Sequence, residues 1–265
     1  VSAIDRLNEQ SCSVHYAAMA YMRQPDAIWG YSREGGTALP SIESDFYAAH
    51  ARQYLRFVHD KVQSVYADST HPDIASDSDM LKHLRGKIRP GSRGFDAGCG
   101  PGAPDVHEFW RHGFDIIGVD AEEHAIDLTK EMFPEIAPKV SVADLKEPLG
   151  YPEQVFDFVI SKTVIQHLDP DSVKKVFLPE IARCMKLDGV LFNLFKTGTG
   201  VKTVYDADYG TDRTFQLYEP EEIVVMLDDL GLEVIPNTDD EPGGVITLVD
   251  PKPMEHCVIY ARKVR

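Results

Sequence analysis

Three glycines beside an acid are the residues of this chain whose spacing points most directly to chemistry. Asp96 is followed by glycines at positions 98, 100 and 102, and a helix-forming run begins at Asp105. Glycines let the backbone turn sharply and let a ligand approach the main chain without meeting a Cβ atom. A strand, such a turn and a helix form the opening unit of a nucleotide-binding α/β sheet. The stretch therefore predicts a nucleotide-type ligand at the turn.

Two classes of cofactor use a turn of this kind. A dinucleotide needs its pyrophosphate cradled by backbone amides, and Gly98, Gly100 and Ala103 give a loose match to its G-x-G-x-x-A pattern. Pro101, however, removes an amide from inside the turn. Asp96 adds a carboxylate that repels phosphates and attracts an ammonium or sulfonium group. These two residues favour a cationic ligand, and the loose match leaves an NAD(P)-dependent oxidoreductase as an alternative.

Further polar positions follow the next apolar runs. Asp120 ends the second predicted strand about 20 residues beyond the turn, where a carboxylate can accept both hydroxyls of a ribose. A dinucleotide enzyme would also place an acid there, so Asp120 indicates a ribose and not one particular cofactor. Ala121 comes next in the chain, Asp144 and Leu145 follow the third predicted strand, and Ser161 ends the fourth.

As a set, these positions resemble the motifs of class I S-adenosylmethionine-dependent methyltransferases. The D-x-G-x-G-x-G stretch is similar to the first motif of that family, and residues 156–161 resemble its fourth-strand motif. The resemblance covers roughly residues 89–235 and implies S-adenosylmethionine as the cofactor. The cofactor-binding residues that it implies are Asp96, Gly98, Gly100, Asp120, Ala121, Asp144, Leu145 and Ser161.

The resemblance also implies a role for several of these residues. Asp96 would act on the ammonium of the cofactor, directly or through water, and Ser161 would lie beside its methionine part. Asp144 would bond the adenine amino group, while Leu145 would pack on the ring or offer its backbone N–H. The Asn/Asp-Pro-Pro-Tyr/Phe motif of enzymes that methylate the amino groups of bases or amides is absent, because residues 161–164 read Ser-Lys-Thr-Val.

A general base is needed only if the acceptor carries a proton that must leave. His167 follows the fourth predicted strand, near the expected position of the cofactor sulfur, and the intrinsic pKa of histidine suits proton transfer. A helix-capping or core histidine would explain its position equally well. His50 and Tyr47 are weaker catalytic candidates, and Lys162 reads as a solvated neighbour and not as a nucleophile.

Strands alternate with helices from residue 93 onward, which implies a parallel sheet with right-handed crossovers. We predict an α/β fold: a three-layer αβα sandwich with a mostly parallel seven-stranded sheet that ends in an antiparallel strand, plus an N-terminal helical cap. The strands are expected over residues 95–97, 114–120, 139–143, 155–161, 189–195, 232–236 and 256–261, with an extra short strand over 245–249. Helices are expected over residues 121–132, 171–185 and 219–230.

The N-terminal third reads differently. Residues 1–88 are predicted to form a helical cap or substrate-binding extension, and residues 89–265 the catalytic domain. Within the extension, helices are expected over residues 14–22, 45–66 and 79–84, with a polar loop over 68–79. Its aromatic residues could pack the helices onto the sheet or build an acceptor pocket. Residues 197–212 read as a loop insertion that serves either as a lid or as a plain surface excursion.

Composition narrows the function further. The chain has 265 residues and a net charge of −16, which disfavours a nucleic-acid substrate because phosphate binding needs a basic face. Its four cysteines are scattered without metal-binding spacing, so we predict free thiols and no metal site. No apolar run reaches membrane-spanning length, and the first residues do not resemble a signal peptide. We therefore predict a cytoplasmic enzyme with a small-molecule acceptor. The sequence leaves the oligomeric state open, with a homodimer as one option.

Four functions stay open at this point. The first, which we favour, is methyl transfer to a small molecule. The second is other chemistry with the same cofactor, such as aminopropyl transfer or intramolecular cyclisation, because the motifs bind the cofactor without fixing which carbon is attacked. The third is the oxidoreductase, and the fourth is a binding module without catalysis. Whether oxygen, nitrogen, sulfur or carbon accepts the methyl group also stays open.

Overall fold

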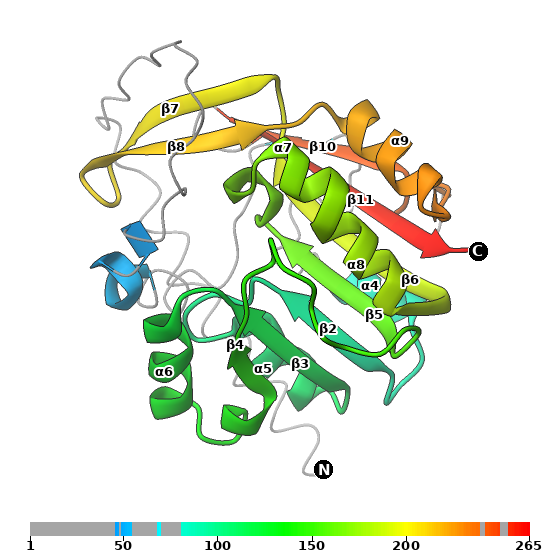
Figure 1. The fold of residues 1–265 in the computed structure, drawn as a ribbon, viewed down its shortest axis with the longest axis horizontal. Helices are drawn as coiled ribbons and strands as arrows, with labels where there is room; N and C mark the ends of the chain where they lie inside the picture. The colour runs from blue at the N-terminus through cyan, green and yellow to red at the C-terminus, as the bar shows by residue number, and fades with distance from the viewer. Residues whose placement is uncertain (1–45, 48, 55–67, 70–80, 239–241, 250–253) are drawn as a thin grey trace, which may run out of the picture.

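The structure is a computed structural model. It describes residues 46–47, 49–54, 68–69, 81–238, 242–249 and 254–265 (Figure 1). The helix predicted over residues 14–22, the part of the second helix after residue 54 and most of the predicted polar loop lie outside these residues. Residues 46–47 and 49–54 are helical, as predicted, and are called the N-terminal segment below.

A single large sheet organises the described residues. Its strands in spatial order are β1 (Asp68–Ser69), β10 (Val245–Val249), β11 (Glu255–Lys263), β6 (Met185–Lys196), β5 (Phe156–Lys162), β2 (Arg93–Ala97), β3 (Asp115–Asp120) and β4 (Val140–Val142), and β9 (Leu232–Val234) also pairs with β11. Strands β6, β5, β2, β3 and β4 pair in parallel, whereas β11 runs antiparallel to β6. The predicted mostly parallel sheet with an antiparallel strand is confirmed. Within the described residues it has nine strands and not the predicted seven, because β1 and the predicted extra strand β10 extend its edge beyond β11.

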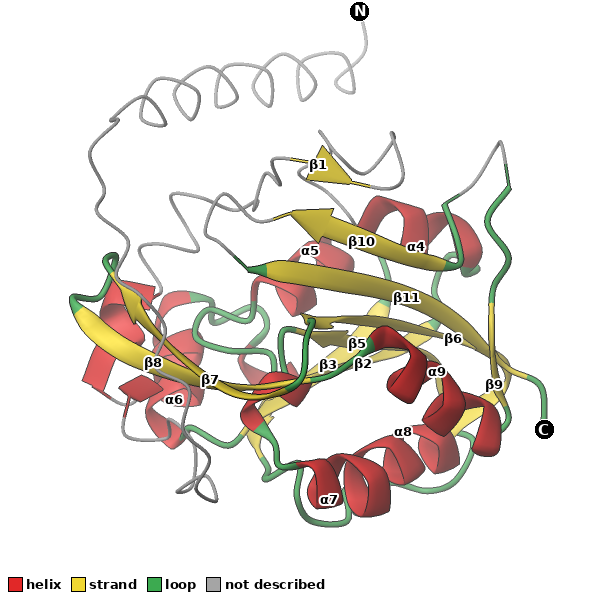
Figure 2. Ribbon diagram, turned by 90° about the horizontal axis from the view of Figure 1, so that it is seen from above, coloured by secondary structure: helices red, strands yellow, loops and turns green. Residues whose placement is uncertain are grey.

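Helices cover both faces of this sheet (Figure 2). One face packs against α4 (Leu81–Lys87), α5 (Pro104–Arg111) and α6 (Glu123–Met132), and the other against α8 (Leu178–Cys184) and α9 (Pro220–Asp229). Strand β5 is buried on both sides, because Phe158 and Ile160 belong to the core beneath α5 while Val159 belongs to the core beneath α8. Burial of each such side chain contributes about 1.5–3 kcal/mol to folding. The three-layer αβα sandwich is confirmed.

The helix predicted over residues 171–185 is not uniform. It consists of α7 (Pro170–Ser172), a π-helical turn η3 (Val173–Phe177) and α8. Pro179 gives the physical reason. It has no N–H to donate to the carbonyl four residues earlier, and its ring crowds that carbonyl. The turn before it therefore widens to the π pattern.

The prediction of a loop over residues 197–212 is wrong. Strands β7 (Gly200–Asp206) and β8 (Thr211–Leu217) form an antiparallel hairpin, shown in yellow at the top of Figure 1. The β-branched and aromatic residues of β7 favour a strand, and Gly210 has the positive φ of 68° that a turn needs. The glycines lie at the base and the tip of the hairpin. Residues 68–69 were also expected in a loop but form β1.

Helix α4 packs as part of the sheet domain. Its Leu81 and Leu84 are buried in the same core as α5 and β6, although the predicted division at residue 88 assigns this helix to the extension. None of the helices within the described ranges is both long and apolar enough to span a membrane.

Candidate active site

The glycine turn lies between β2 and α5, at the carboxyl ends of the parallel strands. Gly98 and Gly100 have φ angles of 78° and 64°, a conformation that side chains other than glycine rarely adopt. A Cβ atom on Gly98 would lie 2.7 Å from the Val164 Cγ2 atom. Glycine is therefore required at position 98 both by the backbone angle and by a neighbouring side chain.

The amides of this turn already have acceptors within the protein. The Gly100 amide donates to Asp120 Oδ2 at 2.9 Å, and the Gly102 amide donates to Thr129 Oγ1 at 2.8 Å. Pro101, between them, has no N–H. A dinucleotide would need these amides for its pyrophosphate, so the arrangement disfavours the oxidoreductase that the loose glycine match left open.

Asp96 is the most unusual group beside the turn. It is 1% exposed, and its Oδ2 atom has no hydrogen-bond partner in the part of the chain that the structure describes. Burial is the main cause that raises the pKa of Asp96 well above its ordinary value; Asp105 raises it further and Lys162 opposes them. A buried carboxylate without a partner is costly. The position therefore fits a cationic or hydrogen-bond-donating ligand, such as the ammonium of S-adenosylmethionine.

Lys162 is an ion-paired residue and not the solvated neighbour that we expected. Its Nζ atom lies 2.9 Å and 3.0 Å from the two carboxylate oxygens of Asp105, at the start of α5. Burial acts to lower the pKa of Lys162, but the Asp105 carboxylate outweighs burial and holds it above its ordinary value. The pair places one positive and one negative charge next to Asp96.

The predicted ribose and adenine residues lie at the same edge of the sheet. Asp120 accepts the amides of Gly100 and Glu122, at 2.9 Å and 3.0 Å, and burial raises its pKa. Ala121 and Asp144 are exposed. Leu145 is buried in the core, so the structure favours its backbone N–H over its side chain as a cofactor contact. The roles of these four predicted residues stay predictions.

The side chains of Ser161 and Asp96 lie on opposite faces of the sheet. It is paired with Ala97 on β2, whereas Asp96 is paired with Ile160. Because paired residues share a face of the sheet and neighbours alternate, the Ser161 side chain occupies the opposite face from Asp96. Ser161 is 1% exposed, and its Oγ atom has no partner among the described residues. A contact between Ser161 and the cofactor stays a prediction, and its backbone is the better candidate.

Two of the three predicted catalytic residues meet. The hydroxyl of Tyr47, in the N-terminal segment, lies 3.1 Å from His167 Nε2. His167 belongs to the 3₁₀ turn η2 (Ile165–His167), which follows β5. Burial is the main cause that holds the pKa of His167 well below its ordinary value, and the positive charges of Arg213 and Lys196 add to it. His167 is therefore a neutral imidazole at neutral pH.

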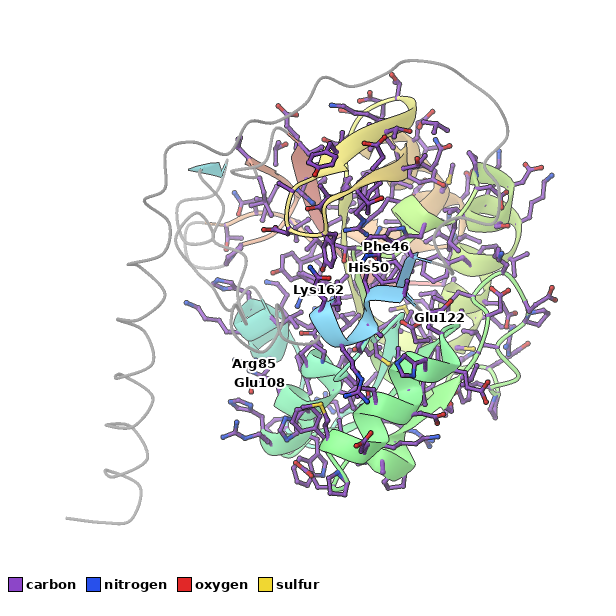
Figure 3. The ribbon with its side chains drawn as sticks, turned by 90° about the vertical axis from the view of Figure 1, so that its left-hand side faces the viewer. Phe46, His50, Arg85, Glu108, Glu122 and Lys162 are labelled. Atoms are coloured by element: carbon purple, nitrogen blue, oxygen red, sulfur yellow. The ribbon has the colours of Figure 1, made fainter. Side chains whose placement is uncertain are left out.

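His50, the third catalytic candidate, lies in the same segment but contacts other groups. Its Nδ1 atom donates to the Phe46 carbonyl at 2.8 Å. Its ring stacks on Phe46 at 4.5 Å and meets Tyr209 edge-on at 5.6 Å. Figure 3 shows Phe46 and His50 on the N-terminal segment. These contacts place His50 in an aromatic cluster, and its catalytic role stays a prediction.

Arg213 is a site residue that sequence reasoning missed. Its Nη2 atom donates to the Tyr47 hydroxyl at 2.7 Å, and its Nη1 atom lies 3.5 Å from Asp206 Oδ2. Its guanidinium carbon lies 4.5 Å to 5.6 Å from the ring centroids of Phe46, Phe215, Tyr47 and Tyr209. Its position just after the stretch 197–212, two residues before Phe215, gave no signal of this role along the chain.

The N-terminal segment bridges the hairpin and the sheet domain. Gln53 Nε2 donates to the Asp208 carbonyl at the hairpin tip at 2.7 Å, and Ala51 packs against Leu128 of α6.

A second cation, Lys196 at the end of β6, donates to His256 Nε2 at 3.0 Å. The described residues hold no group of three or more His, Cys, Asp or Glu side chains arranged to bind a metal ion.

Part of the chain is similar in sequence to known methyltransferases. Residues 95–193 match the family model of a methyltransferase domain. Magnesium-protoporphyrin O-methyltransferase of Rhodobacter capsulatus is 40% identical over 97 residues, which are 35% of this chain and 41% of that protein. Phosphoethanolamine N-methyltransferase 1 of Zea mays is 27% identical over 148 residues, which are 54% of this chain and 28% of that protein. The chain thus spans less than half the length of either relative.

A solved structure extends the likeness to the fold. The 1,6-didemethyltoxoflavin-N1-methyltransferase of Burkholderia thailandensis, solved with 1,6-didemethyltoxoflavin and S-adenosylhomocysteine, superposes with a TM-score of 0.60 at 17% identity. The superposition covers 92% of this chain and 99% of that chain. The two proteins share a fold.

Proposed function

We propose that this chain, which contains a class I S-adenosylmethionine-dependent methyltransferase domain, transfers a methyl group from S-adenosylmethionine to a small-molecule acceptor. The observation that carries the proposal is the buried Asp96 oxygen without a partner, beside a turn whose amides are already bonded. Such a site suits a cation and does not suit a pyrophosphate. The proposal includes the cytoplasmic location and the substrate-binding role of residues 1–88.

The residues that would hold the cofactor follow the glycine turn and the strand ends. Asp96 would bind the ammonium group, and Gly98 and Gly100 would let the methionyl end approach the backbone. Asp120 would accept the ribose hydroxyls, and Asp144 would bond the adenine. When bound, S-adenosylmethionine supplies an electrophilic methyl group on a positively charged sulfur.

Tyr47 and His167 would remove a proton from the acceptor. Because Arg213 donates to the Tyr47 oxygen, we assign the Tyr47 hydrogen to the bond with His167 Nε2. An acceptor hydroxyl could then donate to the Tyr47 oxygen while Tyr47 passes its own proton to Nε2. The neutral state of His167 keeps Nε2 able to accept it. Positioning by the N-terminal segment would supply much of the remaining rate acceleration.

Calorimetry with S-adenosylmethionine, S-adenosylhomocysteine and NADH tests the cofactor assignment. We expect both adenosyl ligands to bind and NADH not to bind. Binding of NADH without either adenosyl ligand would contradict the proposal. Product analysis then separates methyl transfer, which leaves S-adenosylhomocysteine, from aminopropyl transfer or cyclisation, which leaves methylthioadenosine.

A further inference from the structure

We propose that Lys162 is a cofactor-binding residue whose ammonium group holds the α-carboxylate of S-adenosylmethionine, while Asp96 holds the α-ammonium. The inference rests on the proposed use of S-adenosylmethionine, and it assigns a residue to a part of the cofactor that the residues named above do not contact. It is carried by three charged side chains beside the glycine turn, those of Asp96, Lys162 and Asp105.

Asp96 and Lys162 lie on the same face of the sheet. Asp96 on β2 is paired with Ile160 on β5, and Lys162 follows Ile160 by two residues in the same strand. Side chains two residues apart in a strand share a face. Burial is the main cause that raises the pKa of Asp96, and the charge of Lys162 opposes it. A ligand end with both charges would therefore meet two complementary groups on one side of the sheet.

The ion pair of Lys162 does not use all of its donors. The Nζ atom contacts the two oxygens of one carboxylate, that of Asp105, at 2.9 Å and 3.0 Å, whereas an ammonium group has three N–H donors. The side chain of Lys162 is 31% exposed, compared with 13% for that of Asp105. The third N–H can therefore bond a ligand carboxylate while the ion pair stays intact.

The backbone of the glycine turn does not offer donors to this carboxylate. The amides of residues 98 and 99 both donate to the Val119 carbonyl, at 2.9 Å and 2.8 Å. Those of Gly100 and Gly102 donate to side chains, and Pro101 has no N–H. A charged group that leaves water needs a new partner. The carboxylate therefore depends on a side-chain donor beside the turn.

Tyr54 of the N-terminal segment covers this end of the site. A Cβ atom on Gly100 would lie 3.7 Å from the Tyr54 Cε1 atom, so the ring lies against the turn. Burial raises the pKa of Tyr54, and Lys162 is the largest of the charges that oppose it. Figure 3 shows Lys162 beside the same segment. The ring limits the access of water, which strengthens the attraction between Lys162 and a carboxylate.

The assignment bears on the aminopropyl transfer that the motifs left open. The donor of an aminopropyl group has lost its carboxylate, because the transferred chain carries the amine without a carboxyl group. A site that binds the carboxylate through Lys162 favours intact S-adenosylmethionine over that donor. The inference therefore supports methyl transfer over aminopropyl transfer.

Two ligands that differ only by the carboxylate test the inference. S-adenosylhomocysteine and its decarboxylated form both carry the ammonium, so the contribution of Asp96 is common to both and cancels in the ratio of their dissociation constants. Calorimetry with the full chain should show S-adenosylhomocysteine binding at least about tenfold more tightly, because a charge-assisted hydrogen bond is lost with the carboxylate. Equal binding, or tighter binding of the decarboxylated form, would overturn the inference and leave the proposed function standing. If neither ligand binds, the proposed function is wrong and the inference with it.

Variants identify the lysine as the group responsible. Lys162→Met alone would leave the Asp105 carboxylate without its counter-charge, which is destabilising, so it is combined with Asp105→Asn. In this double variant the ratio should fall to about threefold or less, whereas Asp105→Asn alone and Lys162→Arg should keep the preference. The matched control is Lys175→Met, which removes a lysine whose side chain is 66% exposed on η3. A preference in the double variant as large as in the wild type would show that another group binds the carboxylate.

Discussion

The hydroxyl of Tyr47 lies 3.1 Å from the Nε2 atom of His167, although 120 positions separate the two residues in the chain. The contact joins the N-terminal segment to the 3₁₀ turn η2, which follows β5. Arg213, on a third element, donates to the same hydroxyl at 2.7 Å. The proposed proton path therefore exists only when three distant segments come together.

Replacing Tyr47 tests this path. Tyr47→Phe keeps the ring and removes the oxygen between Arg213 and His167, so we expect the rate of labelled-methyl transfer to fall by about 10²–10⁴-fold. Affinity for S-adenosylhomocysteine should change little. Tyr205→Phe on β7 is the matched control, because Tyr205 is 41% exposed. An unchanged rate in Tyr47→Phe would exclude the hydroxyl from proton transfer.

The pH dependence of the rate should reflect His167. A general base loses activity when it is protonated, and burial with two nearby cations holds the pKa of His167 well below 6.5. The acidic fall in kcat assigned to His167 should therefore begin well below pH 6.5, with the rate flat above it. A pH–rate profile measured from pH 4.5 to 8 checks this expectation. A midpoint at or above 6.5 would show that His167 is not the group that titrates.

Cofactor binding should release a proton from Asp96 wherever the pH lies below the pKa of this group in the free protein. Its pKa is raised by burial and by the carboxylates of Asp105 and Asp120, against the opposing charge of Lys162. The bound ammonium favours the ionised form, so affinity should rise with pH until the carboxyl group is ionised in the free protein. Calorimetry in two buffers of different ionisation enthalpy measures the released proton. Asp96→Asn should abolish the buffer dependence, and its persistence there would assign the proton to another group.

The ribose site is tested by Asp120→Ala. We expect a loss of about 1–3 kcal/mol in the free energy of S-adenosylhomocysteine binding, because charge-assisted hydrogen bonds are lost. Part of that loss would come from the Gly100 amide, because Asp120 is its hydrogen-bond acceptor. Asp171→Asn serves as the control, since this side chain is 75% exposed on α7. Equal affinity in Asp120→Ala and the wild type would mean that the ribose lies elsewhere.

The glycine turn permits a matched comparison of two alanine substitutions. Gly98 and Gly113 have similar φ angles of 78° and 83°, but a Cβ atom on Gly113 would meet nothing within 4 Å. Gly113→Ala should therefore lose about 1–2 kcal/mol in the free energy of unfolding from backbone strain alone. Gly98→Ala should lose more, because its Cβ atom meets Val164.

Urea denaturation measures both variants of this comparison. The double variant Gly98→Ala with Val164→Ala shows whether the side-chain contact is the cause, because the two losses should be less than additive. Equal destabilisation by Gly98→Ala and Gly113→Ala would show that the Val164 side chain moves aside without a cost in the free energy of unfolding.

Local pattern was sufficient for the parallel strands of the sheet and for the position of the glycine turn. Alternation of apolar runs with helical runs predicted the parallel strands, and the spacing of Asp96, the glycines and Asp120 placed them at one edge. These features depend on the conformational preferences of short windows, such as the positive φ of Gly98 and Gly100. The sheet then brings strand ends together by its regular geometry.

The contacts among the catalytic candidates were decided only by the tertiary structure. Sequence reasoning named Tyr47, His50 and His167 as candidates, but only packing separates the pair that meets from the residue that does not. It missed Arg213, because the importance of this residue arises from its contact with Tyr47 on a distant segment and from no spacing along the chain. Contacts between distant segments depend on the summed packing of many side chains, which no short stretch of sequence encodes.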